Sequence, residues 1–361
     1  MGYQPADIAF ALIGHQDCWK KITGFVDFFS KSPQGLSAEK VAQVYSFIPP
    51  RVLFDVVVQS VIGQRVKGCY IETFISPDEL APRHWKKNIE KVKAAAACAR
   101  KLGAGVASLG GFTSIVLEGR NDALNDGAFT KFTTGNSLTA AFIVKALEKA
   151  CIKFDRQLAD LQLLVIGATG DIGSACVEYF AGKVKNLLLC ARQNATLQQH
   201  VLALQKKGLQ AEASTDLATL LPQADLIIAI ASSGIPNFNP LLCRKDVIIC
   251  DAGYPRNLVL EFGNDFKDRL FYGGMGVIKG GYTFSPAVHH NLYKFPINNV
   301  AHGCMLEGIV LALEKLYTPF SAGRGNITPD KIEQIYLMAQ KHGITEAPFF
   351  NGLNAWQPPR L

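Results

Sequence analysis

The sequence lacks several features that mark particular classes of protein. No uninterrupted apolar run reaches about 18 residues, so we expect no transmembrane segment. The first fifteen residues, MGYQPADIAFALIGH, carry neither the basic flank nor the long apolar core of a secretory signal. The nine cysteines are scattered, with no CxxC pair and no spacing typical of a metal site. We therefore expect a cytoplasmic protein with mostly buried free thiols and without a tight metal site, while a loosely bound Mg²⁺ would leave no such signature.

Charge and composition set further limits. A formal net charge of +7 is mild for 361 residues and does not predict a nucleic-acid partner. The chain is 48% hydrophobic and 19% charged, and its 32 glycines and 17 prolines are spread along its length, as in a globular protein. This length is too great for one ordinary core, so we expect more than one domain.

From Leu161 onward, short apolar runs alternate with helical segments. LQLLVI, NLLLCA, ADLIIAIA and DVIICDAG are the runs, and each is separated from the next by helical or turn sequence. Such runs predict a parallel sheet covered on both faces, in an α/β fold. We predict a Rossmann-type, doubly wound nucleotide-binding domain over residues 156–295, an N-terminal α/β substrate domain over residues 1–155, and a C-terminal helical segment over residues 296–361.

A glycine turn follows the first of these runs. Its residues are Gly167, Ala168, Thr169, Gly170, Asp171, Ile172 and Gly173. The three glycines permit a tight turn, close approach of a pyrophosphate to the backbone, and close packing of the next helix on the sheet. Between a strand and a helix, this spacing predicts dinucleotide binding.

Two further positions bear on the choice of cofactor. Arg192 stands after the second strand, where an NAD enzyme usually has an acidic residue for the ribose 2′-hydroxyl. A guanidinium there can pair with a 2′-phosphate, which favours NADPH; the alternative is a surface arginine near the site. Ser232 and Ser233 follow the run ADLIIAIA, at a sheet edge that faces the nicotinamide half of the cofactor.

The N-terminal part contains two patches of small hydroxylated residues and one basic segment. The patches supply the candidate substrate-binding residues Phe112, Thr113, Ser114, Thr134, Gly135 and Asn136, although such patches are equally typical of ordinary turns. The basic segment is a helix predicted over residues 77–102, whose lysines and arginines outnumber its acids. It is either a solvated helix face or a docking surface for an acidic partner.

Cys304 is the candidate nucleophile. Asn298 or Asn299 is a plausible N-cap for an apolar helix that would place Cys304 in its first two turns. A helix N-terminus stabilises a thiolate and lowers the pKa of a cysteine. The alternative is a buried core cysteine. His302, two residues before Cys304 on the expected helix, would lie on a different face.

The chain resembles the long-chain acyl-[acyl-carrier-protein] reductases known best from cyanobacteria. The matching stretches are ALIGH, GCYIETFISPDEL, SLGGFTSIV, FTTGN, GATGDIGSA, DAGYPRNL and SAGRGNIT, in family order. The resemblance implies reduction of a fatty acyl thioester to an aldehyde with NADPH through an acyl-cysteine, with Cys304 as the matching nucleophile. Its implied partners are acyl carrier protein or a coenzyme A thioester, and an aldehyde-consuming enzyme.

The chain also departs from the family pattern. Ser232-Ser233 replaces the family's Ser-Met, and the family's Glu-His pair has no clear counterpart in GGMGVIKGGYTFSP. Two other functions therefore stay open. One is a shikimate-dehydrogenase-like, NADP-dependent alcohol or keto dehydrogenase without covalent catalysis; the other is a non-catalytic NADP-binding regulatory protein.

Overall fold

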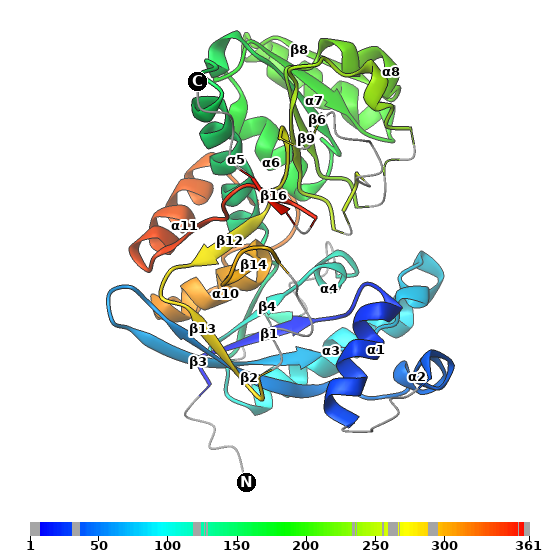
Figure 1. The fold of residues 1–361 in the computed structure, drawn as a ribbon, viewed down its shortest axis with the longest axis vertical. Coiled ribbons are helices and arrows are strands. Elements are labelled where there is room, and N and C mark those ends of the chain that lie inside the picture. The colour runs from blue at the N-terminus through cyan, green and yellow to red at the C-terminus, as the bar shows by residue number, and fades with distance from the viewer. Residues whose placement is uncertain are drawn as a thin grey trace.

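The structure is a computed structural model with two lobes, each built on a six-stranded sheet (Figure 1). It describes residues 8–30, 37–117, 124–125, 127, 129–232, 235, 237–254, 256–258, 266, 268–287, 295–352 and 354–356. The α/β fold class is confirmed. No helix in this part of the chain is long and apolar enough to cross a membrane.

The lower lobe in Figure 1 contains a mixed sheet, in which β3, β1, β4 and β5 run parallel while β2 and β13 are antiparallel to their neighbours. In spatial order its strands are β13 (Tyr282–Ser285), β2 (Arg51–Gln59), β3 (Arg65–Glu72), β1 (Phe10–Gly14), β4 (Val106–Leu109) and β5 (Lys131–Thr133). Every residue of β1 is buried, because both faces of the sheet are covered.

The predicted basic helix is shorter than expected. It begins as α3 (Trp85–Lys101), after the two short 3-10 turns η2 (Pro77–Glu79) and η3 (Pro82–His84). Pro82 disfavours the α conformation in the residue before it, so a continuous helix cannot start at residue 77. α3 buries an alanine-rich face against the sheet. The lobe's other helices are α1 (Trp19–Ser30), α2 (Ala38–Tyr45) and α4 (Phe112–Ile115).

The upper lobe contains a wholly parallel sheet. Its strands in spatial order are β11 (Leu270–Tyr272), β10 (Ile248–Asp251), β9 (Leu226–Ala229), β6 (Gln162–Ile166), β7 (Asn186–Cys190) and β8 (Ala211–Ser214). The first strand lies at the centre and the order reverses between β6 and β9, as in dinucleotide-binding folds. Its connections include α6 (Asp171–Phe180), α7 (Asn194–Lys206), α8 (Leu217–Leu220), η6 (Leu221–Gln223) and η7 (Pro240–Leu242).

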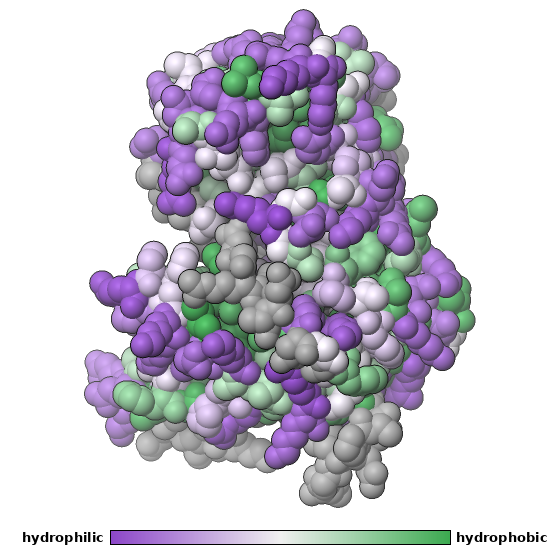
Figure 2. All heavy atoms as spheres, turned by 180° about the vertical axis from the view of Figure 1, so that it is seen from behind, coloured by the Kyte–Doolittle hydropathy of each residue, from purple (hydrophilic) through white to green (hydrophobic). Residues whose placement is uncertain are grey.

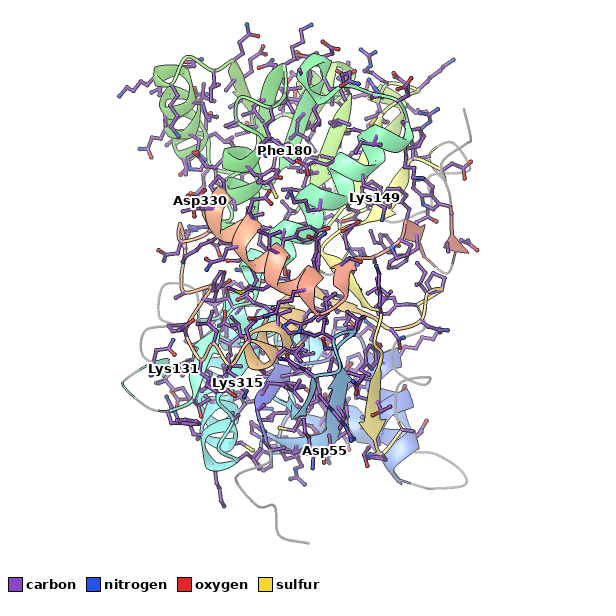
Figure 3. All side chains as sticks on the ribbon, turned by 90° about the vertical axis from the view of Figure 1, so that its left-hand side faces the viewer. Asp55, Lys131, Lys149, Phe180, Lys315 and Asp330 are labelled. Atoms are coloured by element: carbon purple, nitrogen blue, oxygen red, sulfur yellow. The ribbon has the colours of Figure 1, made fainter. Side chains whose placement is uncertain are left out.

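A long helix joins the two lobes. α5 (Asn136–Lys153) begins after β5, leads through η5 (Leu158–Asp160) into β6, and packs against α6, α10 (Gly303–Leu313) and α11 (Pro329–Lys341). Figure 3 shows α11 running across α5, with Asp330 at its start and Lys149 on α5. Lys149 forms a 2.9 Å ion pair with Glu346. The buried apolar residues of α5, α10 and α11 join those of the two sheets into one continuous core.

After the last strand of the upper sheet, the chain enters the lower sheet as β13 and then leaves it again. β14 (Val300–His302), β12 (Met275–Ile278) and β15 (Ile344–Glu346) form a small antiparallel sheet, and β16 (Phe350–Asn351) pairs with β17 (Asn354–Ala355). The C-terminal segment thus contains strands as well as the predicted helices. β13 pairs with β2 although it lies inside the predicted range 156–295. The domain boundaries themselves stay a prediction.

Figure 2 shows the molecule from behind, with polar residues spread over both lobes and apolar residues scattered among them.

Candidate active site

The residues that follow the parallel strands of both sheets line one cleft between the lobes. Its volume is about 1060 Å³. The lower sheet contributes Gly14, His15, Gly110 and Thr134; the upper sheet contributes Gly167, Ala191, Thr215, Ile230, Ala252 and Gly273. The carboxyl ends of parallel strands, next to the reversal of strand order, are where α/β proteins bind ligands.

The glycine turn has the geometry of a dinucleotide site. Gly167 has a φ of +92°, and a Cβ on Gly173 would lie 2.1 Å from the carbonyl oxygen of Gly167. Gly170 is the N-cap of α6, so the first turn of that helix points its free N–H groups at the cleft. Six of the seven predicted turn residues line the cleft; Ala168 is fully buried behind them.

Asp171 ties the glycine turn to two other segments. Its Oδ2 accepts a hydrogen bond from Nδ2 of Asn136 at 2.8 Å, and its Oδ1 accepts one from the backbone N–H of Gly325 at 3.1 Å. Burial raises the pKa of the Asp171 carboxyl, while these two bonds oppose the shift. Asn136 and Asp171 are thus brought together at the starts of α5 and α6.

Three arginines face the cleft. Arg192 and Arg324 are exposed, whereas Arg256 is half-buried and donates to the carbonyl oxygens of Asp251 at 2.9 Å and Gly273 at 3.4 Å. Among the described residues that line the cleft, Asp171 is the one carboxylate. This excess of positive charge suits the phosphates of a dinucleotide. Ser232 also lines the cleft, and Ser233 lies outside the described residues.

Cys304 lies in the first turn of α10 and lines the same cleft. The predicted N-cap is wrong: α10 begins at Gly303 with His302 as N-cap, because residues 300–302 are held in strand β14. The start of α10 packs against Gly135. A side chain at that residue would clash, because its Cβ would lie 2.2 Å from the carbonyl oxygen of Cys304.

The predicted direction of the Cys304 pKa is also wrong. Burial raises the pKa of the thiol, and hydrogen bonds from the backbone N–H groups of Gly111 and Met305 offset this only in part. The resting group is therefore a thiol, with backbone hydrogen bonds that favour its thiolate only in part.

The hydroxyl groups of the two candidate substrate-binding patches form hydrogen bonds with backbone atoms of their own loops. Thr113 Oγ1 donates to the carbonyl oxygen of Gly110 at 2.9 Å, and Ser114 Oγ donates to that of Gly111 at 2.9 Å. Thr134 Oγ1 accepts the backbone N–H of Asn136 at 3.4 Å. Ser114, Thr134 and Asn136 line the cleft, whereas Phe112, Thr113 and Gly135 lie behind its wall.

A buried carboxylate supports this wall from behind. Glu307 on α10 is fully buried, and its Oε2 accepts from the backbone N–H of Leu138 at 3.0 Å and from Ser321 Oγ at 2.9 Å. Its Oε1 accepts from Thr133 Oγ1. Glu307 thereby caps the start of α5 from a different helix.

The cleft residues that sequence reasoning missed or set aside include His15, Tyr254, Arg256 and His302. His15 directly follows β1, and Tyr254 and Arg256 follow β10, so the position after a parallel strand was an available signal. His302 was placed on another helix face because the helix was expected to start earlier. As the N-cap it faces the cleft, and burial lowers the pKa of its imidazole to about 3.

A glycine turn at a reversal of strand order, in a cleft that also contains a cysteine, defines an NAD(P)-dependent oxidoreductase of the Rossmann type. Comparison with known proteins narrows this class. The chain is 30% identical over 355 residues to the long-chain acyl-[acyl-carrier-protein] reductase of Synechococcus elongatus, covering 93% of this chain and 98% of that protein. The chain belongs to the long-chain acyl-[acyl-carrier-protein] reductase family, as a divergent member.

Other similarities are more distant. The chain is 29% identical over 250 residues to the aminotransferase PigE of a Serratia species, covering 68% of this chain and 28% of that protein. Shikimate 5-dehydrogenase from Listeria monocytogenes, solved with shikimate and NAD, is 11% identical, covers 92% of this chain and 97% of that one, and has a TM-score of 0.40. The nucleotide-binding domain of Thermoplasma volcanium glutamyl-tRNA reductase is 20% identical and has a TM-score of 0.26. The match covers 39% of this chain and 86% of that one. No family model matches the chain.

Proposed function

We propose that this protein reduces a long-chain acyl thioester to an aldehyde with NADPH, through an acyl group carried on Cys304. The observation that supports this most is the position of Cys304. It shares one cleft with the glycine turn, and backbone hydrogen bonds, that of Gly111 among them, lower the pKa of its thiol against the effect of burial. A cysteine of this kind combines a nucleophile with groups that stabilise an oxyanion.

The first half of the reaction is thiol exchange. The sulfur of Cys304 attacks the thioester carbonyl, a new carbon–sulfur bond forms, and the bond to the carrier sulfur breaks. The proton that Cys304 loses is the one that the leaving sulfur gains. The N–H groups of Gly111 and Met305 are the proposed donors to the oxyanion of the tetrahedral intermediate. They take this role instead of the hydroxyls of Thr113 and Ser114, which are bound to backbone carbonyls.

The second half is reduction of the acyl-cysteine. NADPH supplies a hydride to the acyl carbon when it is bound. The same N–H groups would stabilise the second tetrahedral intermediate, from which the sulfur of Cys304 departs to release the aldehyde. One proton from solvent restores the thiol. The glycine turn and α6 would hold the diphosphate, and Arg192 the 2′-phosphate that distinguishes NADPH from NADH.

Intact-protein mass spectrometry tests the covalent step. Wild-type and Cys304→Ser protein are mixed with a long-chain acyl thioester in the absence of NADPH. We expect an acyl-sized mass gain on the wild type alone, discharged as aldehyde when NADPH is added. If the wild type binds NADPH but gains no mass, the covalent mechanism is wrong. Turnover of an alcohol or keto substrate would then favour a dehydrogenase, and the absence of any turnover a regulatory protein.

The partner we propose is an acyl carrier protein, with a coenzyme A thioester as the second candidate and an aldehyde-consuming enzyme downstream. The basic segment is less available than its sequence indicated. Lys87 forms an ion pair with Glu79, Lys93 pairs with Glu90, and Lys91 donates to the carbonyl oxygen of Phe74. Arg83 in η3 and Lys86 at the start of α3 are exposed, and we place the docking contact there.

Charge reversal tests this contact. Arg83→Glu with Lys86→Glu should raise KM for an acyl carrier substrate and leave KM for a small acyl thioester unchanged, because only the carrier has an acidic surface. Lys206→Glu on α7 is a matched control, since Lys206 is also exposed but lies on the other lobe. Equal effects on both substrates would refute docking at α3.

A further inference from the structure

His15 is a buried histidine at the end of β1 whose two ring nitrogens are both occupied. It is 4% exposed. Its Nδ1 lies 3.1 Å from the carbonyl oxygen of Gln16, and its Nε2 lies 3.0 Å from the backbone nitrogen of Phe112. A carbonyl oxygen only accepts and a backbone N–H only donates. Both contacts are hydrogen bonds only in the neutral tautomer that carries its proton on Nδ1.

The Phe112 N–H that His15 accepts belongs to the loop that contacts the nucleophile. Gly111, one residue earlier, lies beside the Cys304 thiol, whose pKa a backbone hydrogen bond from Gly111 lowers against the effect of burial. Gly111 has a φ of +58°, and a Cβ there would lie 2.8 Å from a ring carbon of Tyr254 and 3.1 Å from Nε2 of His15. Gly111 is therefore enclosed between His15, Tyr254 and Cys304, and a small shift of residues 111–112 would move its N–H off the sulfur.

We propose that His15 is a positioning residue that holds the Gly111 N–H on the Cys304 thiol through its hydrogen bond to Phe112. This role rests on the proposed function of Cys304. His15 does not act as the base that takes the thiol proton, because its Nδ1 carries a hydrogen and the lone pair of Nε2 is directed at the Phe112 N–H. Burial also lowers the pKa of His15, which keeps the imidazole neutral.

Two conservative variants separate this role from general packing. In His15→Gln the side-chain oxygen reaches the position of Nε2 and can still accept the Phe112 N–H. In His15→Asn the side chain is shorter and places its acceptor near Nδ1, so Phe112 loses its partner. Neither variant changes the other titratable groups around the loop and the thiol: Asp17, Lys21, Tyr254, His302 and Glu307.

The readout is the pH profile of Cys304 alkylation by iodoacetamide, followed on the Cys304 peptide by mass spectrometry. The other eight cysteines are thereby excluded, and neither acyl substrate nor NADPH is needed. We expect His15→Gln to keep the wild-type profile. His15→Asn should move it to higher pH, with about a tenfold slower reaction at neutral pH for each unit by which the thiol pKa rises. Melting temperature and NADPH binding serve as controls for folding.

Identical profiles for wild type and a folded His15→Asn protein would overturn the proposal. Should that variant fail to fold, ¹⁵N spectra of the wild-type histidine rings decide instead. We expect His15 to be neutral with its proton on Nδ1, and a proton on Nε2 would overturn the proposal equally. Absence of an acyl adduct on wild-type Cys304 would contradict the proposed function. The alkylation profile and the ¹⁵N spectra would still test the role of His15.

Discussion

The side-chain amide of Asn136 donates a 2.8 Å hydrogen bond to the carboxylate of Asp171. Asn136 is the first residue of α5 and Asp171 the first of α6, so one bond joins the helix that leaves the lower sheet to the helix that opens the nucleotide site. A carboxylate at a helix N-terminus is favourable in itself. The bond to Asn136 adds a constraint: the glycine turn is held in a fixed position relative to the wall that contains Cys304.

A double-mutant cycle measures this constraint. Asn136→Ala and Asp171→Ala should each destabilise the protein, with a coupling free energy of about 1 to 2 kcal/mol, because a partly buried hydrogen bond to a charged group is lost. Urea unfolding gives the four free energies. Asn194→Ala with Gln198→Ala is the matched control, since that 3.3 Å bond lies on an exposed helix face and should show almost no coupling. Equal coupling in both cycles would contradict the constraint.

Gly135 should tolerate no side chain. Gly135→Ala would place a Cβ 2.2 Å from the carbonyl oxygen of Cys304 and displace the start of α10. We expect loss of acylation and a decrease of more than about 2 kcal/mol in the free energy of unfolding.

Gly208→Ala isolates the backbone part of this effect. Its φ of +77° is close to the +72° of Gly135, but no atom lies within 4 Å of its added Cβ. It should cost about 1 kcal/mol and leave acylation intact. If both variants are destabilised equally, the contact with Cys304 contributes nothing.

Much of the upper lobe was predictable because its signals are local. The run LQLLVI, the turn GATGDIG and the run NLLLCA each determine their own conformation, and they form β6, the glycine turn and β7. Apolar content and glycine spacing suffice for elements of this kind.

The surroundings of Cys304 were not predictable in the same way. Asn299 looked like a helix cap, but residues 300–302 pair with β12, a strand more than twenty residues earlier. The thiol pKa depends on burial and on a backbone hydrogen bond from Gly111, almost two hundred residues away in sequence. Both errors arise from long-range contacts that no local pattern contains, and the same holds for the cleft position of His302.

Arg192 should set the preference between cofactors. Arg192→Ala is expected to raise the Kd of NADPH by about tenfold, because a charge-assisted bond to the 2′-phosphate is lost, and to leave the Kd of NADH nearly unchanged. Fluorescence titration of both cofactors measures this, with Lys206→Ala as a control for removal of one positive charge from the same lobe. If the Kd of NADPH and the Kd of NADH rise equally, Arg192 instead contacts a part of the cofactor that both share.

The buried carboxyl of Glu72 should make stability depend on pH. Glu72 is the last residue of β3, at the sheet edge from which His15 also emerges. Its carboxylate accepts hydrogen bonds from Gln16 Nε2, Tyr70 Oη and the Phe74 N–H, each at 3.0 Å. Burial nevertheless raises its pKa from 4.5 to about 7. The folded state thus binds the proton more tightly than the unfolded state, so this stabilisation is complete below about pH 4.5 and is lost as the pH rises through 7.

Glu72→Gln removes the titration while keeping a side chain of the same shape. Between pH 5 and pH 7 the free energy of unfolding of the wild type should fall relative to that of the variant, by about 3 kcal/mol at most, because one pKa unit corresponds to about 1.4 kcal/mol. Lys91, the nearby cation, has a pKa lowered to about 8 by burial and titrates above this window. Glu39→Gln is the control, since that carboxylate is exposed on α2. A difference between wild type and Glu72→Gln that is constant over the window would mean that Glu72 is ionised throughout, with its three donors outweighing the cost of burial.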